Sequence, residues 1–299
     1  MMAILRAEDG RIRTVWRILI FLVGLAAGGV GVSLGFRALL ALPGISSPTR
    51  LLSWQITLHT ALLTGLWFGW VTLCRRLIDR RPLSSLGLRR LTPRGTAGLM
   101  GAALLGGGLI CVGIAVLYVA GAYRYTGIGS VGVFPPAATL FIFAAFAEEI
   151  VLRGYILQNL RDIRHPVAGV IISAVIFSGF HALNPAVGAS FLPAANLFLA
   201  GVLLALAYIS SGNIWYPTAL HYGWNLVEGP VLGTPVSGLS MESWLNFERT
   251  AGTPRMLSGG EFGLEGSVVM TGVQCVAICG FLMVIWFRPS VGGGERSSR

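Results

Sequence analysis

The sequence predicts an all-α fold, a polytopic bundle of about eight membrane-spanning helices. The composition and the recurrence of apolar runs carry this prediction. Of the 299 residues, 54% are hydrophobic and only 11% are charged, and the mean hydropathy is +0.74. A water-soluble domain needs far more charge on its surface, so a single helical membrane domain is expected.

Apolar runs of about 20 residues, each long enough to cross a hydrocarbon core, follow one another along the chain. The first run is longer than the core of a signal peptide, which predicts a retained helix. We divide the chain into N-terminal helices with an arginine-rich loop (1–135), a core with the candidate chemistry (136–230), and an outer connection with the last helix and a tail (231–299). The predicted spans are 15–42, 54–74, 97–122, 136–158, 166–186, 193–210, 214–230 and 267–287.

The net charge of +10 comes entirely from arginine, and the arginines fall between the apolar runs. This distribution follows the positive-inside rule and does not form a nucleic-acid-binding stripe, so the expected partner is the lipid bilayer. Segment 75–94 holds seven arginines, which predicts a cytoplasmic loop. With eight crossings, Arg161, Arg164 and the arginines after residue 287 fall on the same side. Both termini are then cytoplasmic, in a multi-pass protein of the plasma membrane.

The longest outer connection, 231–266, is expected to be a solvated loop, with a lid or substrate-docking loop as the alternative. His59 is expected to make a polar contact between helices. The pattern Gly127-Ile-Gly129-Ser-Val-Gly132 matches a dinucleotide fingerprint but lacks a strand–turn–helix context, so no cofactor role is expected. Glycines that predict close helix packing are Gly24, Gly28, Gly29, Gly31, Gly101, Gly106, Gly107 and Gly108. Cysteines expected to be small buried hydrophobes, without disulfides, are Cys74, Cys111, Cys275 and Cys279.

Ionisable side chains within the predicted spans are few and concentrated. A carboxylate at the bilayer centre costs on the order of 3 kcal/mol, so its presence there needs a reason. Glu149 and Arg153 are four residues apart on one helical face, which predicts an ion pair. Glu148 is turned about 100° away from Glu149 and is the candidate base, pointing into the bundle.

Two further patterns place polar pairs on single helical faces: Phe177-x-x-x-His181 in the fifth span and His221-x-x-x-Asn225 in the seventh. A carboxylate with an imidazole can deprotonate a water, and a histidine with an asparagine can hold a developing oxyanion. Glu148, His181 and His221 also match a catalytic zinc shell with one open position. The spacing leaves both interpretations open. Asn184, Asn196 and Glu228 are expected to be packing or capping groups.

The motifs EExxxR, FxxxH and HxxxN, in this order, resemble the type II CAAX prenyl endopeptidases and their bacterial CPBP (Abi) relatives, over roughly residues 136–228. The resemblance implies an intramembrane endopeptidase acting on a membrane-associated protein or peptide, with or without a prenyl group. Glu148 with His181 would activate water. His221 and Asn225 would stabilise the oxyanion, and Glu149 and Arg153 would support the site. The family is commonly labelled a metalloprotease, but a metal-free glutamate mechanism has also been argued for it, so a bound Zn²⁺ stays open.

Two other function classes remain as alternatives. The first is a non-catalytic bacteriocin-immunity or membrane scaffold protein with the same fold. The second is a proton-coupled transporter, although inverted repeats are not found. Other intramembrane proteases are excluded because the sequence has no HExxH, no aspartate in a predicted span and no rhomboid-type GxSG. The sequence does not name the natural substrate.

Overall fold

The computed structural model describes residues 12–40, 49–161, 166–182, 184 and 186–287, and it confirms an all-α helical bundle. Arg6, Arg11, Arg164 and the arginines after residue 287 lie outside the described residues. The α-helices are α2 (Thr14–Leu40), α3 (Thr49–Leu73), α4 (Pro93–Val119), α5 (Phe134–Glu149), α6 (Gln158–Arg161), α7 (Pro166–Phe180), α8 (Phe191–Ser211), α9 (Trp215–Leu226), α10 (Arg255–Ser258) and α11 (Val268–Trp286). The π-helical segments are η1 (Cys74–Ile78), η4 (Ile150–Leu157) and η6 (Val227–Val231). The 3₁₀ turns are η2 (Leu83–Leu86), η3 (Val131–Val133), η5 (Val187–Ala189), η7 (Gly260–Phe262) and η8 (Leu264–Gly266).

Within the described residues, 5 helices are long and apolar enough to cross a membrane. The predicted count of about eight is therefore not confirmed. The other three predicted spans are helical but short or interrupted: α5 continues into π-helical η4, α7 has only 15 residues, and α9 continues into η6. The long apolar helices are Thr14–Leu39, Trp54–Ile78, Pro93–Val119, Phe191–Ser211 and Val268–Trp286.

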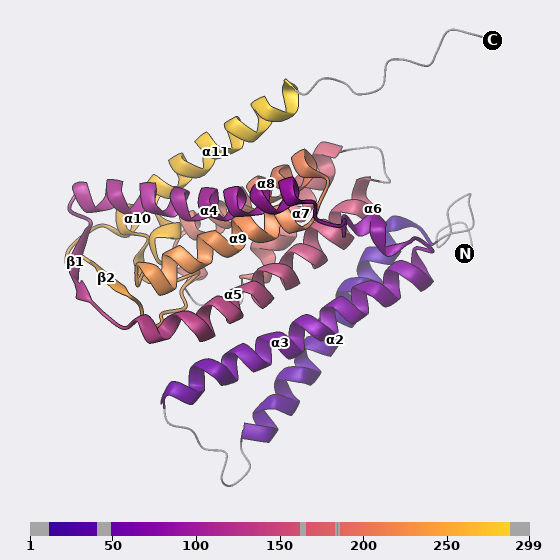
Figure 1. The fold of residues 1–299 in the computed structure, drawn as a ribbon, viewed down its shortest axis with the longest axis horizontal. Helices are drawn as coiled ribbons and strands as arrows, with labels where there is room; N and C mark the ends of the chain where they lie inside the picture. The colour runs from indigo at the N-terminus through magenta and orange to yellow at the C-terminus, as the bar shows by residue number, and fades with distance from the viewer. Residues whose placement is uncertain (1–11, 41–48, 162–165, 183, 185, 288–299) are drawn as a thin grey trace.

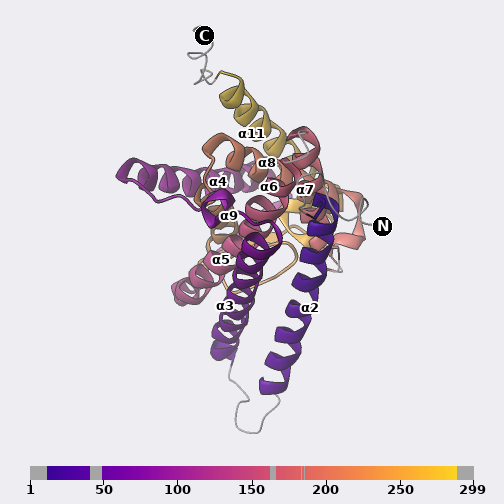
Figure 2. The ribbon, with the colours of Figure 1, turned by 90° about the vertical axis from the view of Figure 1, so that its right-hand side faces the viewer.

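Four helices, α5, α7, α8 and α9, form the centre of the bundle. Helix α9 packs against α4 and α5, α7 packs against α8, and α11 packs against α8. The pair α2–α3 contacts the centre through α5 and lies on the opposite side from α11 (Figures 1 and 2). Many outward-facing side chains of these outer helices are large and apolar, as expected for surfaces in contact with lipid.

The four cysteines are free, as predicted, but only Cys74 is buried. The expectation of burial was wrong for Cys111, Cys275 and Cys279, which are exposed on their helices. An apolar run does not show which of its faces meets protein, because a lipid-facing position is as apolar as a buried one.

Helices α4 and α9 approach so closely that their backbones touch. A Cβ built at Gly106 would lie 2.0 Å from the Leu220 carbonyl oxygen, and one at Gly223 would lie 2.0 Å from the Ala103 carbonyl oxygen. The predicted glycine packing is thus confirmed at Gly106, whereas no described atom lies within 4 Å of a Cβ built at Gly108. Because α9 bears His221 and Asn225, this contact helps to set the depth and rotation of both side chains.

Gly223→Ala is expected to destabilise the protein by at least about 1–3 kcal/mol, because the added methyl meets backbone atoms that cannot rotate away. Thermal unfolding in detergent, followed by intrinsic fluorescence, measures the effect. Gly108→Ala is the matched control on α4 and should unfold at or above the wild-type temperature, since alanine favours a helix over glycine. Equal unfolding temperatures for both variants would contradict the close contact.

Strands β1 (Tyr123–Ile128) and β2 (Leu245–Arg249) form a two-stranded antiparallel sheet that the sequence did not predict. The sheet lies at the end of the bundle opposite the start of α2 (Figure 1). Burial raises the pKa of Tyr123, whose hydroxyl donates to the Ser258 carbonyl oxygen at 2.8 Å. Strand β1 overlaps the start of the glycine pattern at 127–132, but it pairs antiparallel and so lacks the parallel unit of a dinucleotide site.

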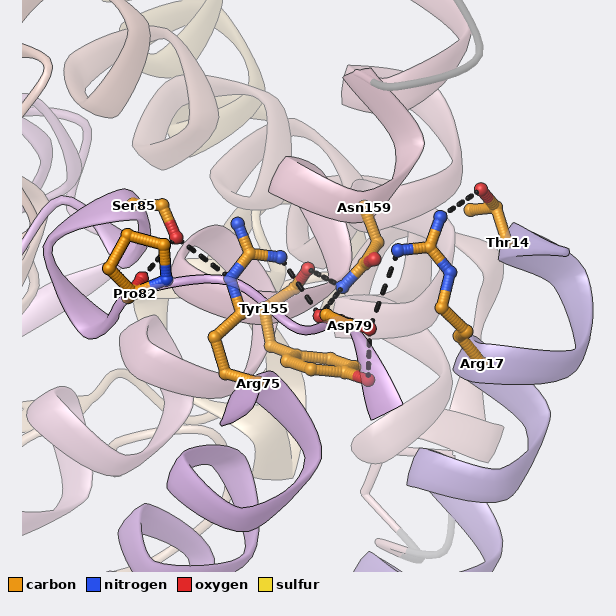
Figure 3. Close-up of polar contacts among 8 residues, drawn as sticks. All are labelled: Thr14, Arg17, Arg75, Asp79, Pro82, Ser85, Tyr155 and Asn159. Carbon is orange, nitrogen blue, oxygen red and sulfur yellow. Dashed lines mark hydrogen bonds and ion pairs between the residues drawn. The ribbon is translucent and has the colours of Figure 1, made fainter. Parts of the chain in front are cut away.

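Asp79, directly after η1, is fully buried and gathers donors from separate segments (Figure 3). Its Oδ1 accepts from Arg17 Nη1 at 3.4 Å and from the Tyr155 hydroxyl at 3.3 Å. Its Oδ2 accepts from Arg75 Nη1 at 2.9 Å and from Asn159 Nδ2 at 3.0 Å. This Asp79 cluster ties α2, η1, η4 and α6 together at one end of the bundle. The only sequence signal for it was the four-residue spacing of Arg75 and Asp79.

Candidate active site

The fourth predicted span places a buried ion pair at the centre of the bundle. Glu149, the last residue of α5, and Arg153, in η4, are both fully buried, and Arg153 Nη1 lies 2.9 Å from Glu149 Oε1. Arg153 Nη2 also donates to the Gly201 carbonyl oxygen of α8 at 2.8 Å, and its guanidinium lies 5.0 Å from the Phe177 ring centre. The predicted pair is present, and it joins α5, α7 and α8.

Glu149 has a second partner that the sequence did not indicate. Its Oε1 lies 3.1 Å from Nδ1 of His221, a residue 72 positions further along the chain. A carboxylate can only accept, so Nδ1 carries the proton of this hydrogen bond. The contact fixes the orientation of the imidazole and directs its Nε2 away from Glu149.

His181 follows the last residue of α7. Its Nδ1 lies 3.0 Å from the Phe177 carbonyl oxygen, which can only accept, so Nδ1 donates. In the neutral ring, Nε2 then has a free lone pair and can accept a proton. Phe177 also contacts both imidazoles, with ring centres 5.1 Å from His181 and 6.0 Å from His221.

A cavity of about 240 Å³ brings together four of the predicted site residues: Glu148, His181, His221 and Asn225. Glu148 is partly buried, and its Oε2 has no hydrogen-bond partner among the described residues. Glu148 and His181 share this cavity, with His181 placed directly after α7, which has only 15 residues. Glu149 and Arg153 do not line this cavity.

The motifs that meet at this cavity can be compared with those of known protein families. Residues 130–227 match the family model of the Rce1-like type II CAAX prenyl endopeptidases. The predicted family resemblance is therefore confirmed over this segment, which contains all six predicted site residues. No curated protein matches the chain.

A larger groove of about 790 Å³ adjoins the cavity of the Rce1-like segment. Its walls are mostly apolar side chains of α2, α3 and α7, such as Leu25, Trp67 and Phe180, and they include Ser33 and Arg37 of α2. Glu148 and His181 line both the groove and the cavity. These two side chains therefore lie at the boundary between the mostly apolar groove and the cavity that also contains His221 and Asn225.

The described residues do not fit a three-ligand zinc shell. Among them, no three His, Cys, Asp or Glu side chains gather closely enough to hold a metal ion. His221 and His181 each use Nδ1 in a hydrogen bond within the protein, which leaves Nε2 of each ring as the nitrogen available to a ligand. Glu148, His181 and His221 thus line one cavity.

Residues outside the Rce1-like segment also line the cavity, and the sequence did not single them out. Ser237 and Glu265 come from the outer connection, which had been expected to be a solvated loop. No local pattern distinguishes Glu265 from other acidic loop residues. Asn196, predicted to pack or cap, is buried and donates to the Glu265 and Ser267 carbonyl oxygens at 2.6 and 2.8 Å. Glu228 is fully buried but does not line the cavity.

Proposed function

We propose that this protein is an intramembrane endopeptidase that hydrolyses a peptide bond of a membrane-associated protein or peptide. The match to the Rce1-like family supports protease activity of the CAAX prenyl endopeptidase type in general. The observation that carries the proposal is Glu148, a carboxylate whose Oε2 is buried without a partner among the described residues and which faces a cavity shared with His181, His221 and Asn225. A buried carboxylate beside an imidazole suits general base work.

In the proposed reaction, Glu148, assisted by His181, takes a proton from a water molecule. The water oxygen attacks the carbonyl carbon of the scissile peptide bond. His221, as an imidazolium, donates from Nε2 to the oxyanion, and the Asn225 amide donates beside it. Collapse of the tetrahedral intermediate breaks the C–N bond, and Glu148 returns its proton to the leaving amine.

The buried ion pair supports this chemistry by its charge. With His221 protonated, two positive charges, on Arg153 and His221, balance two negative charges, on Glu148 and Glu149. Glu149 contacts both cations directly, at 2.9 Å and 3.1 Å. Paired charges of this kind cost far less to bury than isolated ones.

The apolar groove supports a substrate that carries a lipid or an apolar segment. A chain lying in the groove would reach Glu148 and His181 directly, because both side chains line the groove as well as the cavity. We infer a prenyl or other lipid group as the occupant of this groove. We also propose that the protein lies in the plasma membrane with both termini cytoplasmic, in line with the arginines of segment 75–94.

The deciding experiment is cleavage of matched lipidated and unlipidated peptides by the purified protein in detergent. We expect cleavage, with a lower KM for the lipidated peptides, since the groove would bind the lipid in the ground state and the transition state alike. Failure of well-folded protein to cleave any peptide would contradict the proposal and favour the immunity or scaffold function.

Chelators are expected to leave the rate unchanged. The proposed mechanism uses no metal ion, because the described residues do not assemble a ligand shell. The measurement is kcat/KM before and after incubation with 1,10-phenanthroline and with EDTA. A loss that added Zn²⁺ restores would overturn the metal-free mechanism while leaving the protease activity standing.

A further inference from the structure

The outer connection closes one side of the cavity. Val236, Ser237 and Leu239 line it, and Glu265 in η8 lies beside them. Glu265 is only 8% exposed and lies outside the Rce1-like segment. The cavity thus has a second carboxylate, one that the proposed reaction does not use.

The Glu265 side chain connects α9 to the outer connection. Its Oε1 accepts from Trp224 Nε1 at 2.7 Å, and its Oε2 accepts from the Ser237 backbone N–H at 2.8 Å and the Ser237 hydroxyl at 3.0 Å. Trp224 directly precedes Asn225 and lies close to one helical turn after His221. A hydrogen bond to the Trp224 indole therefore acts on the part of α9 that bears both proposed oxyanion donors.

Ser237 belongs to a tight turn at residues 236–239, the lid turn. Val236 and Leu239 close it with two backbone hydrogen bonds, of 3.0 and 2.8 Å. Ser237 has a φ of 47°, a conformation that residues other than glycine rarely adopt, so the turn depends on contacts from outside it. Glu265 supplies two of them, and Asn184, three residues after His181, donates from its amide to the Ser237 carbonyl oxygen.

The backbone of Glu265 is itself hydrogen-bonded to a central helix. Asn196 of α8, 1% exposed, donates to the Glu265 carbonyl oxygen at 2.6 Å. The carboxylate is therefore fixed relative to the central helices, and it can transmit that position to α9 and to the lid turn.

We propose that Glu265 is a positioning residue of the site, which orients the His221–Asn225 face of α9 through Trp224 and holds the lid turn over the cavity through Ser237. The kinetic part rests on the proposed function, because orientation of α9 matters only if His221 and Asn225 hold the oxyanion. The structural part does not depend on any activity.

The kinetic test compares Glu265→Gln, Trp224→Phe and the double variant in the full-length protein. The glutamine keeps the shape but replaces one acceptor oxygen by an amide group. We expect kcat to fall by about 10- to 100-fold with KM within about threefold of wild type. The kcat of the double variant should be no lower than that of the less active single variant, because both changes break the same Glu265–Trp224 hydrogen bond. Glu261→Gln is the control, since Glu261 is an exposed residue of the same connection and should leave kcat unchanged.

Hydrogen–deuterium exchange of the lid turn is the second measurement. Residues 236–239 should exchange at least about tenfold faster in Glu265→Gln than in Glu261→Gln, in the same detergent. Unchanged exchange, or a kcat of Glu265→Gln equal to that of Glu261→Gln, would overturn the proposal. Inactivity of the wild type on every peptide would refute the proposed function instead, and the exchange data would still decide whether Glu265 holds the lid turn.

Discussion

Glu148→Ala is expected to abolish peptide cleavage while the protein still inserts and folds. Removal of a general base lowers kcat by about 100- to 10,000-fold, because the water must then be deprotonated without a positioned acceptor. The loss of stability should be small compared with the loss of activity, because Glu148 Oε2 has no hydrogen-bond partner among the described residues and its charge acts on Arg153 and His221 only at a distance. The measurement is kcat/KM on a cleaved peptide, together with thermal unfolding of the same preparation.

His59→Ala is the control for Glu148→Ala. His59 Nε2 lies 3.2 Å from the Ser33 hydroxyl, and its ring lies 4.9 Å from Phe36, so it makes the predicted polar contact between α2 and α3. It does not line the cavity. We expect activity close to that of the wild type. An equal loss of activity in both variants would mean that the polar residues form a structural network and not a catalytic site.

Asp79→Ala is expected to cause the largest loss of stability. The substitution leaves Arg75, which is 1% exposed, without the carboxylate that its Nη1 contacts at 2.9 Å. Breaking a buried ion pair by removing one partner costs about 3–5 kcal/mol, because the remaining charge is left uncompensated. For a protein of this size, that loss lowers the unfolding temperature by on the order of 10 °C. Thermal unfolding in detergent measures it.

The exposed ion pair between Arg124 and Glu248 provides the comparison. Its atoms lie 3.1 Å apart, but the side chains are 65% and 57% exposed, so water screens the interaction. Glu248→Ala should therefore unfold within about 2 °C of the wild type. If Asp79→Ala and Glu248→Ala unfold at the same temperature, the Asp79 cluster does not hold α2 to the bundle as described.

The sequence by itself determined the features that depend on neighbours along one helix. The apolar runs predicted a helical membrane bundle, and the i,i+4 spacing predicted the Glu149–Arg153 pair, seen at 2.9 Å. The motif order predicted the family match over residues 130–227. Helical periodicity fixes which side chains share a face, so these inferences needed no knowledge of packing.

Only the tertiary structure decided how deep each helix lies, how it is rotated, and which distant side chains meet. The early end of α7 and the π-helical segments are not visible in hydropathy, which is why the predicted count of spans is not confirmed. The Glu149–His221 contact, the Asp79 cluster and the place of Glu265 in the cavity each join residues far apart in the chain. Their positions follow from close contacts such as that between Gly106 and Leu220, where side-chain volume on two helices fixes their relative placement, and no single helix determines that.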